Sequence, residues 1–134
     1  MRPLLITAAL TLVLTASLWA HGWDIPPGAE REQIPFLITP EILSIGRSAF
    51  EAQCQRCHGP TGHGDGPDLD PQYVNADLTD IWRAGLNPGG VVYYRILNGK
   101  LLGATVPRTH SFRGRLTSEQ IWSVVAYARS LRIP

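Results

Sequence analysis

The sequence lacks an excess of either charge, and this absence removes one large class of function. Its formal net charge is +1, and charged residues make up only 17% of the chain. Proteins that bind nucleic acid through phosphate contacts carry a marked excess of Lys and Arg. We therefore expect no nucleic-acid partner. The 134 residues, 44% of them hydrophobic, are sufficient for one ordinary folded domain.

The signs of a β-protein are also lacking, because neither alternating apolar residues nor hairpin dipeptides stand out. Helix signals are present instead. Thr39 and Pro40 can begin a helix that continues into the cysteines at positions 54 and 57. Thr117 and Gln120 fit a capping box, and an apolar stripe follows them along the chain. These patterns predict an all-α domain.

Two weaker helices are predicted between these ends. Residues 91–97, stopped by Asn98-Gly99, form one, although their valines and tyrosines also favour a strand. Residues 77–85 form a short one. The segment 59–67, GPTGHGDGP, is predicted as a loop because it is mostly glycine and proline.

The start of the chain indicates export. Residues 1–20 hold Arg2 and then an almost unbroken apolar run, which is typical of a secretory signal peptide. Cleavage is expected after Ser17 or after Ala20; the alternative is an uncleaved anchor that tethers the domain to a membrane. Residues 21–38 are predicted as an extended Pro-rich arm. The domain itself is predicted to span 39–134 and to leave the cytoplasm.

The chain has two cysteines, and both lie in CQRCHGP, residues 54–60. Cys-x-x-Cys-His is a signature of covalent haem attachment. Cys54 and Cys57 are one helical turn apart, so their sulfurs can reach the two vinyl groups of one haem. His58 follows directly and is placed to bring an imidazole nitrogen under the iron. A chain of this size also gains a large apolar centre from a bound haem.

Three other interpretations of the two cysteines compete with haem. One is a Cys54–Cys57 disulfide, which an oxidising compartment permits. A thioredoxin-like redox pair is the second, but the βαβ pattern of that fold is missing. The third is zinc, but no second pair of ligands follows at zinc-like spacing.

The chain resembles the class I c-type cytochromes, of the monohaem type found in bacterial periplasms, over residues 40–133. Two segments carry the resemblance: GRSAFEAQCQRCHGPTGHGDGP and LTSEQIWSVVAYARSL. Gly46, Phe50 and Tyr127 match the family positions where the first and last helices pack together. The resemblance implies three main helices and loops around one covalent haem c, with His58 as the proximal iron ligand. It also implies electron transfer as the activity.

One family feature is missing, since the only methionine is Met1. The usual sixth iron ligand in this family is a methionine before the last helix. Val106, in Thr-Val-Pro, stands at one alignment of that position and cannot bind iron. His110 lies nearby and can bind iron as a neutral imidazole. Either His110 closes a bis-histidine site, or the distal side is open to a gas or a peroxide.

Other polar residues receive smaller roles. Arg95, on the helix before the ligand loop, is the arginine expected to pair with a haem propionate. Further candidates for the propionates are Arg83, Trp82, Tyr93, Tyr94 and Trp122, for which ordinary core or surface positions are the competing interpretation. His63 and the acidic run Asp65, Asp68 and Asp70 are expected on a solvated loop, and His21 could bind metal at a free N-terminus.

The sequence therefore predicts a periplasmic electron carrier that moves one electron between transient redox partner proteins. No catalytic set of residues is evident. An open-site haem protein, acting as a gas sensor or a peroxidase, is one alternative. A cytochrome subunit of a larger dehydrogenase or oxidase complex is the other, and the arm would then serve as a tether.

Overall fold

The protein is described by a computed structural model that covers residues 22–71, 76–79, 87–99 and 110–132. Within these ranges the regular elements are helices, and no strand is formed. The elements are η1 (Ala29–Arg31), α1 (Pro40–Gln53), α2 (Gln55–His58), α4 (Gly89–Asn98) and α5 (Ser118–Ser130). The prediction of a small all-α cytochrome-like domain is confirmed. None of these helices is both long and apolar enough to span a bilayer.

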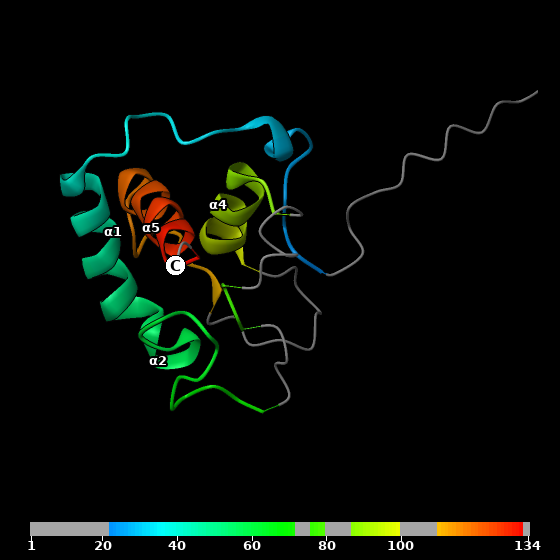
Figure 1. The fold of residues 1–134 in the computed structure, drawn as a ribbon. Coiled ribbons are helices and arrows are strands. Elements are labelled where there is room, and N and C mark those ends of the chain that lie inside the picture. Colours follow the sequence, from blue (N-terminus) through cyan, green and yellow to red (C-terminus); the bar gives the residue numbers. More distant parts are fainter. Residues whose placement is uncertain (1–21, 72–75, 80–86, 100–109, 133–134) are drawn as a thin grey trace, which may run out of the picture.

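Helices α1 and α5 pack directly on each other, and Gly46 permits the close approach (Figure 1). A Cβ atom at Gly46 would lie 2.0 Å from the carbonyl oxygen of Ser123. One turn further along α1, the Phe50 ring meets the Tyr127 ring edge-on, with 5.4 Å between centroids. The predicted contact of Gly46 and Phe50 with the last helix is thus present.

The helix starts follow their capping residues. The Thr39 side chain accepts a hydrogen bond from the backbone N–H of Ile42, with Pro40 at the first helical position. Thr117 and Gln120 exchange both hydrogen bonds of a capping box at the start of α5. Each cap satisfies backbone N–H groups that have no partner inside the helix.

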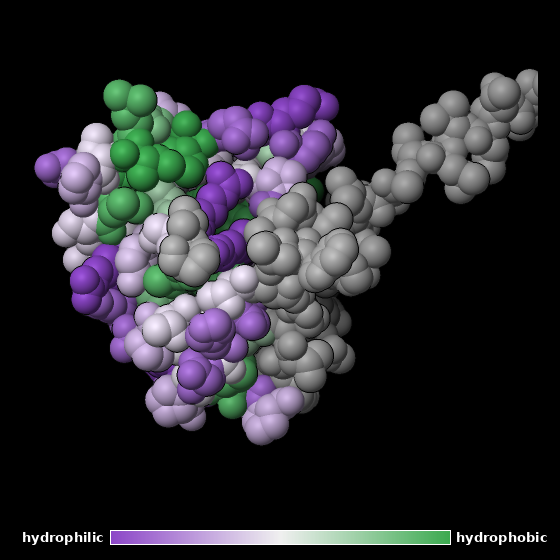
Figure 2. Space-filling view, viewed as in Figure 1, coloured by the Kyte–Doolittle hydropathy of each residue, from purple (hydrophilic) through white to green (hydrophobic). Residues whose placement is uncertain are grey.

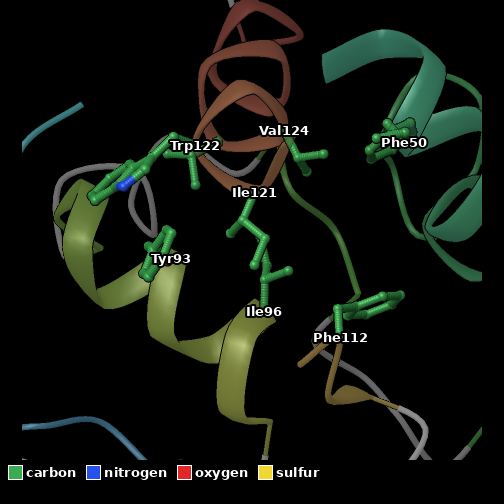
Figure 3. Close-up of a cluster of buried hydrophobic side chains, with 9 residues drawn as sticks. Phe50, Tyr93, Ile96, Phe112, Ile121, Trp122 and Val124 are labelled. Atoms are coloured by element: carbon green, nitrogen blue, oxygen red, sulfur yellow. The ribbon is translucent and has the colours of Figure 1, made fainter. Parts of the chain in front are cut away.

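The core lies around α5, which packs against both α1 and α4 (Figure 3). The rings of Tyr93 and Trp122 stack with 4.4 Å between centroids. Figure 3 shows Ile96 of α4 pointing toward Ile121 of α5, with Phe112 nearby. Residues 93 and 96 share one helical face, so burying that face stabilises a helix where β-branched residues alone would favour a strand.

Two predicted helix boundaries differ from the structure. Helix α1 ends at Gln53 instead of running through the cysteines, because Cys54 departs from helical geometry with φ −115°. A new short helix, α2, then starts at Gln55. The helix predicted over 77–85 is not formed at Asp77–Thr79, and its remaining residues lie outside the described ranges.

The arm before α1 lies along α4 and carries the one turn of η1 (Figure 1, blue to cyan). Near the start of α4, the backbone N–H of Gly90 donates to the Glu32 carbonyl at 3.1 Å. Ala29 is fully buried there, and a Cβ at Gly90 would lie 2.0 Å from its carbonyl oxygen. At the other end of α4, Asp24 N–H donates to the Gly99 carbonyl at 3.1 Å. The arm therefore runs antiparallel to α4.

Large hydrophobic side chains are exposed near the start of α1, where Figure 2 shows an apolar patch. They are Leu37, Ile38 and Ile45, and Leu37 is 85% exposed. The cysteines follow the other end of the helix, roughly 20 Å away along 14 residues. The patch is therefore separate from the region of the cysteines.

Candidate functional site

The two cysteines lie at the junction of α1 and α2. The N–H of Cys54, the residue after α1, donates to the Phe50 carbonyl at 2.8 Å. Its own carbonyl accepts from Cys57 and His58, which begins the turn of α2. Both cysteines are free thiols and partly buried. Burial raises the pKa of the Cys54 thiol to about 12, and the nearby Cys57 contributes to the rise to a smaller extent.

The glycine-rich loop after α2 folds back over the motif. The N–H groups of Gly64 and Gly66 donate to the carbonyls of His58 and Cys57, at 2.8 and 3.2 Å. A Cβ at Gly66 would lie 2.4 Å from the Arg56 carbonyl oxygen. The loop thus occupies the carbonyl groups at the end of α2 that have no partner inside the helix. Its glycines hold the cysteines and His58 in one fixed arrangement.

The proximal histidine predicted from the sequence, His58, is held by a single backbone carbonyl. Its Nδ1 lies 2.6 Å from the carbonyl oxygen of Ala76. A carbonyl oxygen only accepts, so Nδ1 carries the proton and Nε2 carries the lone pair that can bind a metal. Burial lowers the pKa of His58, although the Ala76 hydrogen bond opposes this, and the neutral ring is therefore favoured. This is the form that ligates iron.

His110 lies against the end of α4. Two backbone N–H groups after it, of Phe112 and Arg113, donate to the carbonyls of Ile96 and Leu97 at 2.9 and 3.1 Å. His110 Nδ1 lies 3.1 Å from the carbonyl oxygen of Arg95. The same logic as for His58 puts the proton on Nδ1 and the lone pair on Nε2.

Gly99 allows this segment to approach. It has φ +70° and ψ −146°, a conformation that only glycine adopts readily. A Cβ at Gly99 would also lie 2.9 Å from the backbone nitrogen of Ser111. The predicted helix stop at Asn98-Gly99 therefore has a second consequence, since it makes room for the backbone of His110 and Ser111.

The rings of the two histidines lie at a separation that suits one metal ion. Their ring centroids are 6.2 Å apart, and the ring planes meet at 78°. Two metal–nitrogen bonds of about 2 Å, each extended by about 1.1 Å to the ring centre, span roughly 6.2 Å. The observed separation therefore fits iron bound on both sides by imidazole. A haem fits this donor set, because two cysteine thiols lie directly before one of the two rings.

Arg95 lies on the same side as His110. Its guanidinium donates to the Asn87 side chain at 2.6 Å and lies 5.5 Å from the centre of the Trp23 ring. Its Nε is buried without a hydrogen-bond partner among the described residues. Burial lowers the pKa of Arg95. A buried cationic donor without an acceptor fits a carboxylate that the protein itself does not supply, such as a haem propionate.

The remaining predicted residues have ordinary positions where they are described. Tyr93 donates to Ser118 at 3.0 Å, and Tyr94 donates to the Glu32 carboxylate at 3.1 Å. His63 is on the surface, with 59% of its side chain exposed, and lies 3.0 Å from the Thr79 hydroxyl. Among the described residues, no group of three His, Cys, Asp or Glu side chains is arranged to hold a metal ion. His21, Trp82, Arg83 and Val106 lie outside these ranges.

Sequence reasoning missed three contributors to the site. They are Ala76, whose carbonyl holds His58; Gly99, which makes room for His110; and Trp23, whose ring touches both His110 and Arg95. Ala76 acts through its backbone, and Trp23 lies in an arm without any periodic pattern. No signal in the sequence indicated either one.

A comparison with protein families gives a match at residues 42–127, to the family described as cytochrome C oxidase, cbb3-type, subunit III. This range covers more than half of the chain and includes the cysteine motif, α4 and most of α5. No curated protein matches the chain at a significant level. The chain belongs to this family of c-type cytochromes, which carry a covalent haem c and use its iron for electron transfer.

Proposed function

We propose that the protein is a periplasmic electron carrier whose single haem c is ligated by His58 and His110. The observation that carries this proposal is the separation of the two imidazole rings, 6.2 Å between centroids. When bound, the haem supplies one iron atom that changes reversibly between its ferric and ferrous states. The chain's own residues hold that group, fix its ligands and exclude other ligands.

Cys54 and Cys57 are proposed to hold the haem through thioether bonds to its two vinyl groups. Cys54 is held by a backbone hydrogen bond at the end of α1, and Cys57 lies next to the loop carbonyl of Asp68, 3.6 Å from its sulfur. The backbone of Cys54 and the thiol of Cys57 are therefore held by the protein itself before attachment. Covalent bonds retain the haem in a domain too small to enclose it by packing alone.

His58 and His110 are proposed to supply two neutral nitrogen ligands. Each ring is oriented by one carbonyl, that of Ala76 or that of Arg95. Such partners fix the tautomer and make the ligating nitrogen more basic. Methionine ligation raises the reduction potential of a haem, so a bis-histidine site is expected at a lower potential than a His/Met site.

Arg95 is proposed to pair with one haem propionate through its buried Nε. The guanidinium is already oriented by Asn87 and by the face of Trp23, so little side-chain entropy is lost when a carboxylate binds. The Arg95 side chain then holds the carboxylate, while the backbone carbonyl of Arg95 holds His110. One residue would thus connect the haem edge to the sixth ligand.

Location and partners follow from the leader and the family. The apolar segment at residues 1–20 supports export, and the periplasm is the compartment where c-type haem attachment and free electron carriers meet. We propose transient redox partners, which need only a small docking area around an exposed haem edge. A membrane tether follows if the leader is retained.

A second function, as a cytochrome subunit of an oxidase complex, is favoured by the family match itself. The two roles differ in the lifetime of the partner contact. A subunit is recovered with a larger membrane complex through purification in mild detergent, whereas a carrier is recovered alone in the soluble periplasmic fraction.

The experiment that tests the carrier proposal is a visible spectrum of the haem-loaded protein with and without carbon monoxide. We expect the wild-type protein to be six-coordinate and low-spin, with little response to carbon monoxide. His110→Ala should become high-spin and bind the gas readily, whereas the surface variant His63→Ala should behave like wild type. Rapid binding of carbon monoxide by the wild-type protein would overturn the proposal and favour an open-site sensor or peroxidase.

A further inference from the structure

The Trp23 ring contacts both residues that define the candidate distal side. Its centroid is 5.0 Å from that of His110, and the planes meet at 72°, an edge-to-face contact. The Arg95 guanidinium lies over the same ring, 5.5 Å from its centroid. Arg95 also provides the carbonyl that lies 3.1 Å from His110 Nδ1. His110 is therefore held at one ring nitrogen by Arg95 and against one face or edge by Trp23.

The part of the arm that carries Trp23 has its own anchors on α4. Asp24, the next residue, donates its N–H to the Gly99 carbonyl, and its carbonyl accepts from the Asn98 side chain at 2.9 Å. Further along, Glu32 accepts from the Gly90 N–H, and Tyr94 donates to its carboxylate. Because these contacts do not involve the Trp23 ring, a change in the ring should leave the arm in place.

The contact with the Arg95 carbonyl holds the His110 imidazole at Nδ1, and this contact by itself permits rotation of the ring about its own axis. The edge-to-face contact with Trp23 removes this freedom, and the Phe112 ring, 6.1 Å from His110, limits it from another side. Cation–π contact with Arg95 in turn holds the indole ring in place. We propose that Trp23 is a positioning residue for the sixth iron ligand and that the N-terminal arm thereby closes the distal side of the haem.

This inference rests on the proposed ligation by His110, and its consequence is kinetic. An external ligand can bind the ferrous iron only after His110 leaves, so the rate of carbon monoxide binding reports how often the ligand dissociates. Aromatic pairs of this kind stabilise the contact enough to change an equilibrium by roughly 2- to 12-fold. Loss of the Trp23 edge should raise the rate of binding by about that factor.

The test compares Trp23→Leu with Trp23→Phe in the haem-loaded protein. Leucine fills much of the space without an aromatic edge, whereas phenylalanine keeps the edge. We expect carbon monoxide to bind several-fold faster to Trp23→Leu, and Trp23→Phe to remain within about twofold of wild type. Leu37→Ala serves as a control on the same arm, since Leu37 is 85% exposed. Covalent haem content and far-ultraviolet circular dichroism should be unchanged in all three.

The outcomes separate this inference from the one on which it rests. If His110→Ala opens the site but Trp23→Leu binds carbon monoxide at the wild-type rate, the positioning role is wrong and the ligation stands. If the wild-type protein binds the gas as fast as His110→Ala, the ligation itself is wrong. Should Trp23→Leu lose its folded spectrum, Trp23→Met takes its place, because it also lacks an aromatic edge, and a wild-type binding rate in that variant would overturn the positioning role.

Discussion

The proximal and distal sides of the candidate haem site are built in different ways. The proximal side uses residues 54–66 and the carbonyl of Ala76, which lie close together in the sequence; a short helix, a glycine loop and that one carbonyl hold the cysteines and His58. The distal side brings together three separate segments, which are the arm at Trp23, the end of α4 and the chain at His110. A local motif therefore defines one side, and tertiary packing defines the other.

The largest expected effect comes from removing the proximal attachment. The double variant Cys54→Ser, Cys57→Ser should retain no covalent haem and should lose most of its tertiary structure, because a chain of this size depends on the haem for part of its core. Haem staining on a denaturing gel measures the attachment directly.

Arg56→Gln is the matched control for the attachment variant. Arg56 lies between the cysteines, and its ion pair with Asp68 is exposed, so its loss should change stability by less than about 1 kcal/mol. Covalent haem in the double variant would show that the motif is not the attachment site.

The next effect tests the framework that both sides share. Gly46→Ala should destabilise the protein by about 3 kcal/mol, because the added Cβ would overlap the Ser123 carbonyl oxygen and force α1 away from α5. Urea unfolding followed by circular dichroism measures the change.

Ser48→Ala in the same helix is the comparison for Gly46→Ala. Ser48 is exposed, and alanine there should slightly stabilise the helix. An equal response of the two variants would mean that the close contact between α1 and α5 is absent.

A smaller effect distinguishes the distal side. Gly99→Ala should lower the free energy of unfolding by about 2 kcal/mol, because alanine does not readily adopt the backbone conformation of Gly99. It should also increase the rate of carbon monoxide binding, because the new Cβ lies against the backbone of His110 and Ser111. Stopped-flow binding and urea unfolding measure the two consequences separately.

Gly114→Ala isolates the backbone cost. Gly114 has φ +75°, close to the +70° of Gly99, but nothing lies within 4 Å of a Cβ placed there. The Gly114→Ala substitution should lower the free energy of unfolding by about 1 kcal/mol and leave carbon monoxide binding unchanged. Identical gas-binding rates in the two glycine variants would break the link between Gly99 and His110.

The smallest expected effect comes from the helix caps, which do not distinguish the proximal side from the distal side. Thr117→Ala should lower the free energy of unfolding by about 1 kcal/mol, since it removes the capping box of α5. Thr39→Ala should lower the free energy of unfolding by less, because Ile42, the third residue of α1, has no side-chain acceptor that could complete a capping box. Neither change should alter the visible spectrum of the haem. A changed spectrum in either variant would show that the start of that helix influences the iron ligands.

The elements that the sequence predicted well are those that depend on neighbouring residues. The caps at Thr39 and Thr117, the glycine loop after the cysteines and the contact of Gly46 with α5 all follow from local patterns or from the family resemblance. The junction at Cys54 was misjudged, because nothing in the helical periodicity marks the one residue where φ changes.

The distal side was less predictable for a physical reason. His110 was a candidate only because the methionine was missing, and a loop position next to Arg and Thr gave no sign of its contacts. Its position results from the carbonyl of Arg95, the backbone conformation of Gly99 and the Trp23 ring, and the last of these lies 87 residues before His110 in the chain. Such contacts depend on how the arm and α4 pack together.

The central claim is that two histidines ligate one iron, and nitrogen hyperfine spectroscopy of the ferric protein tests it most directly. With histidine labelled by ¹⁵N, the account predicts two coordinated imidazole nitrogens per iron in the wild-type protein and one in His110→Ala. A single labelled nitrogen on the wild-type iron would contradict the account and would leave the distal side open or occupied by another ligand.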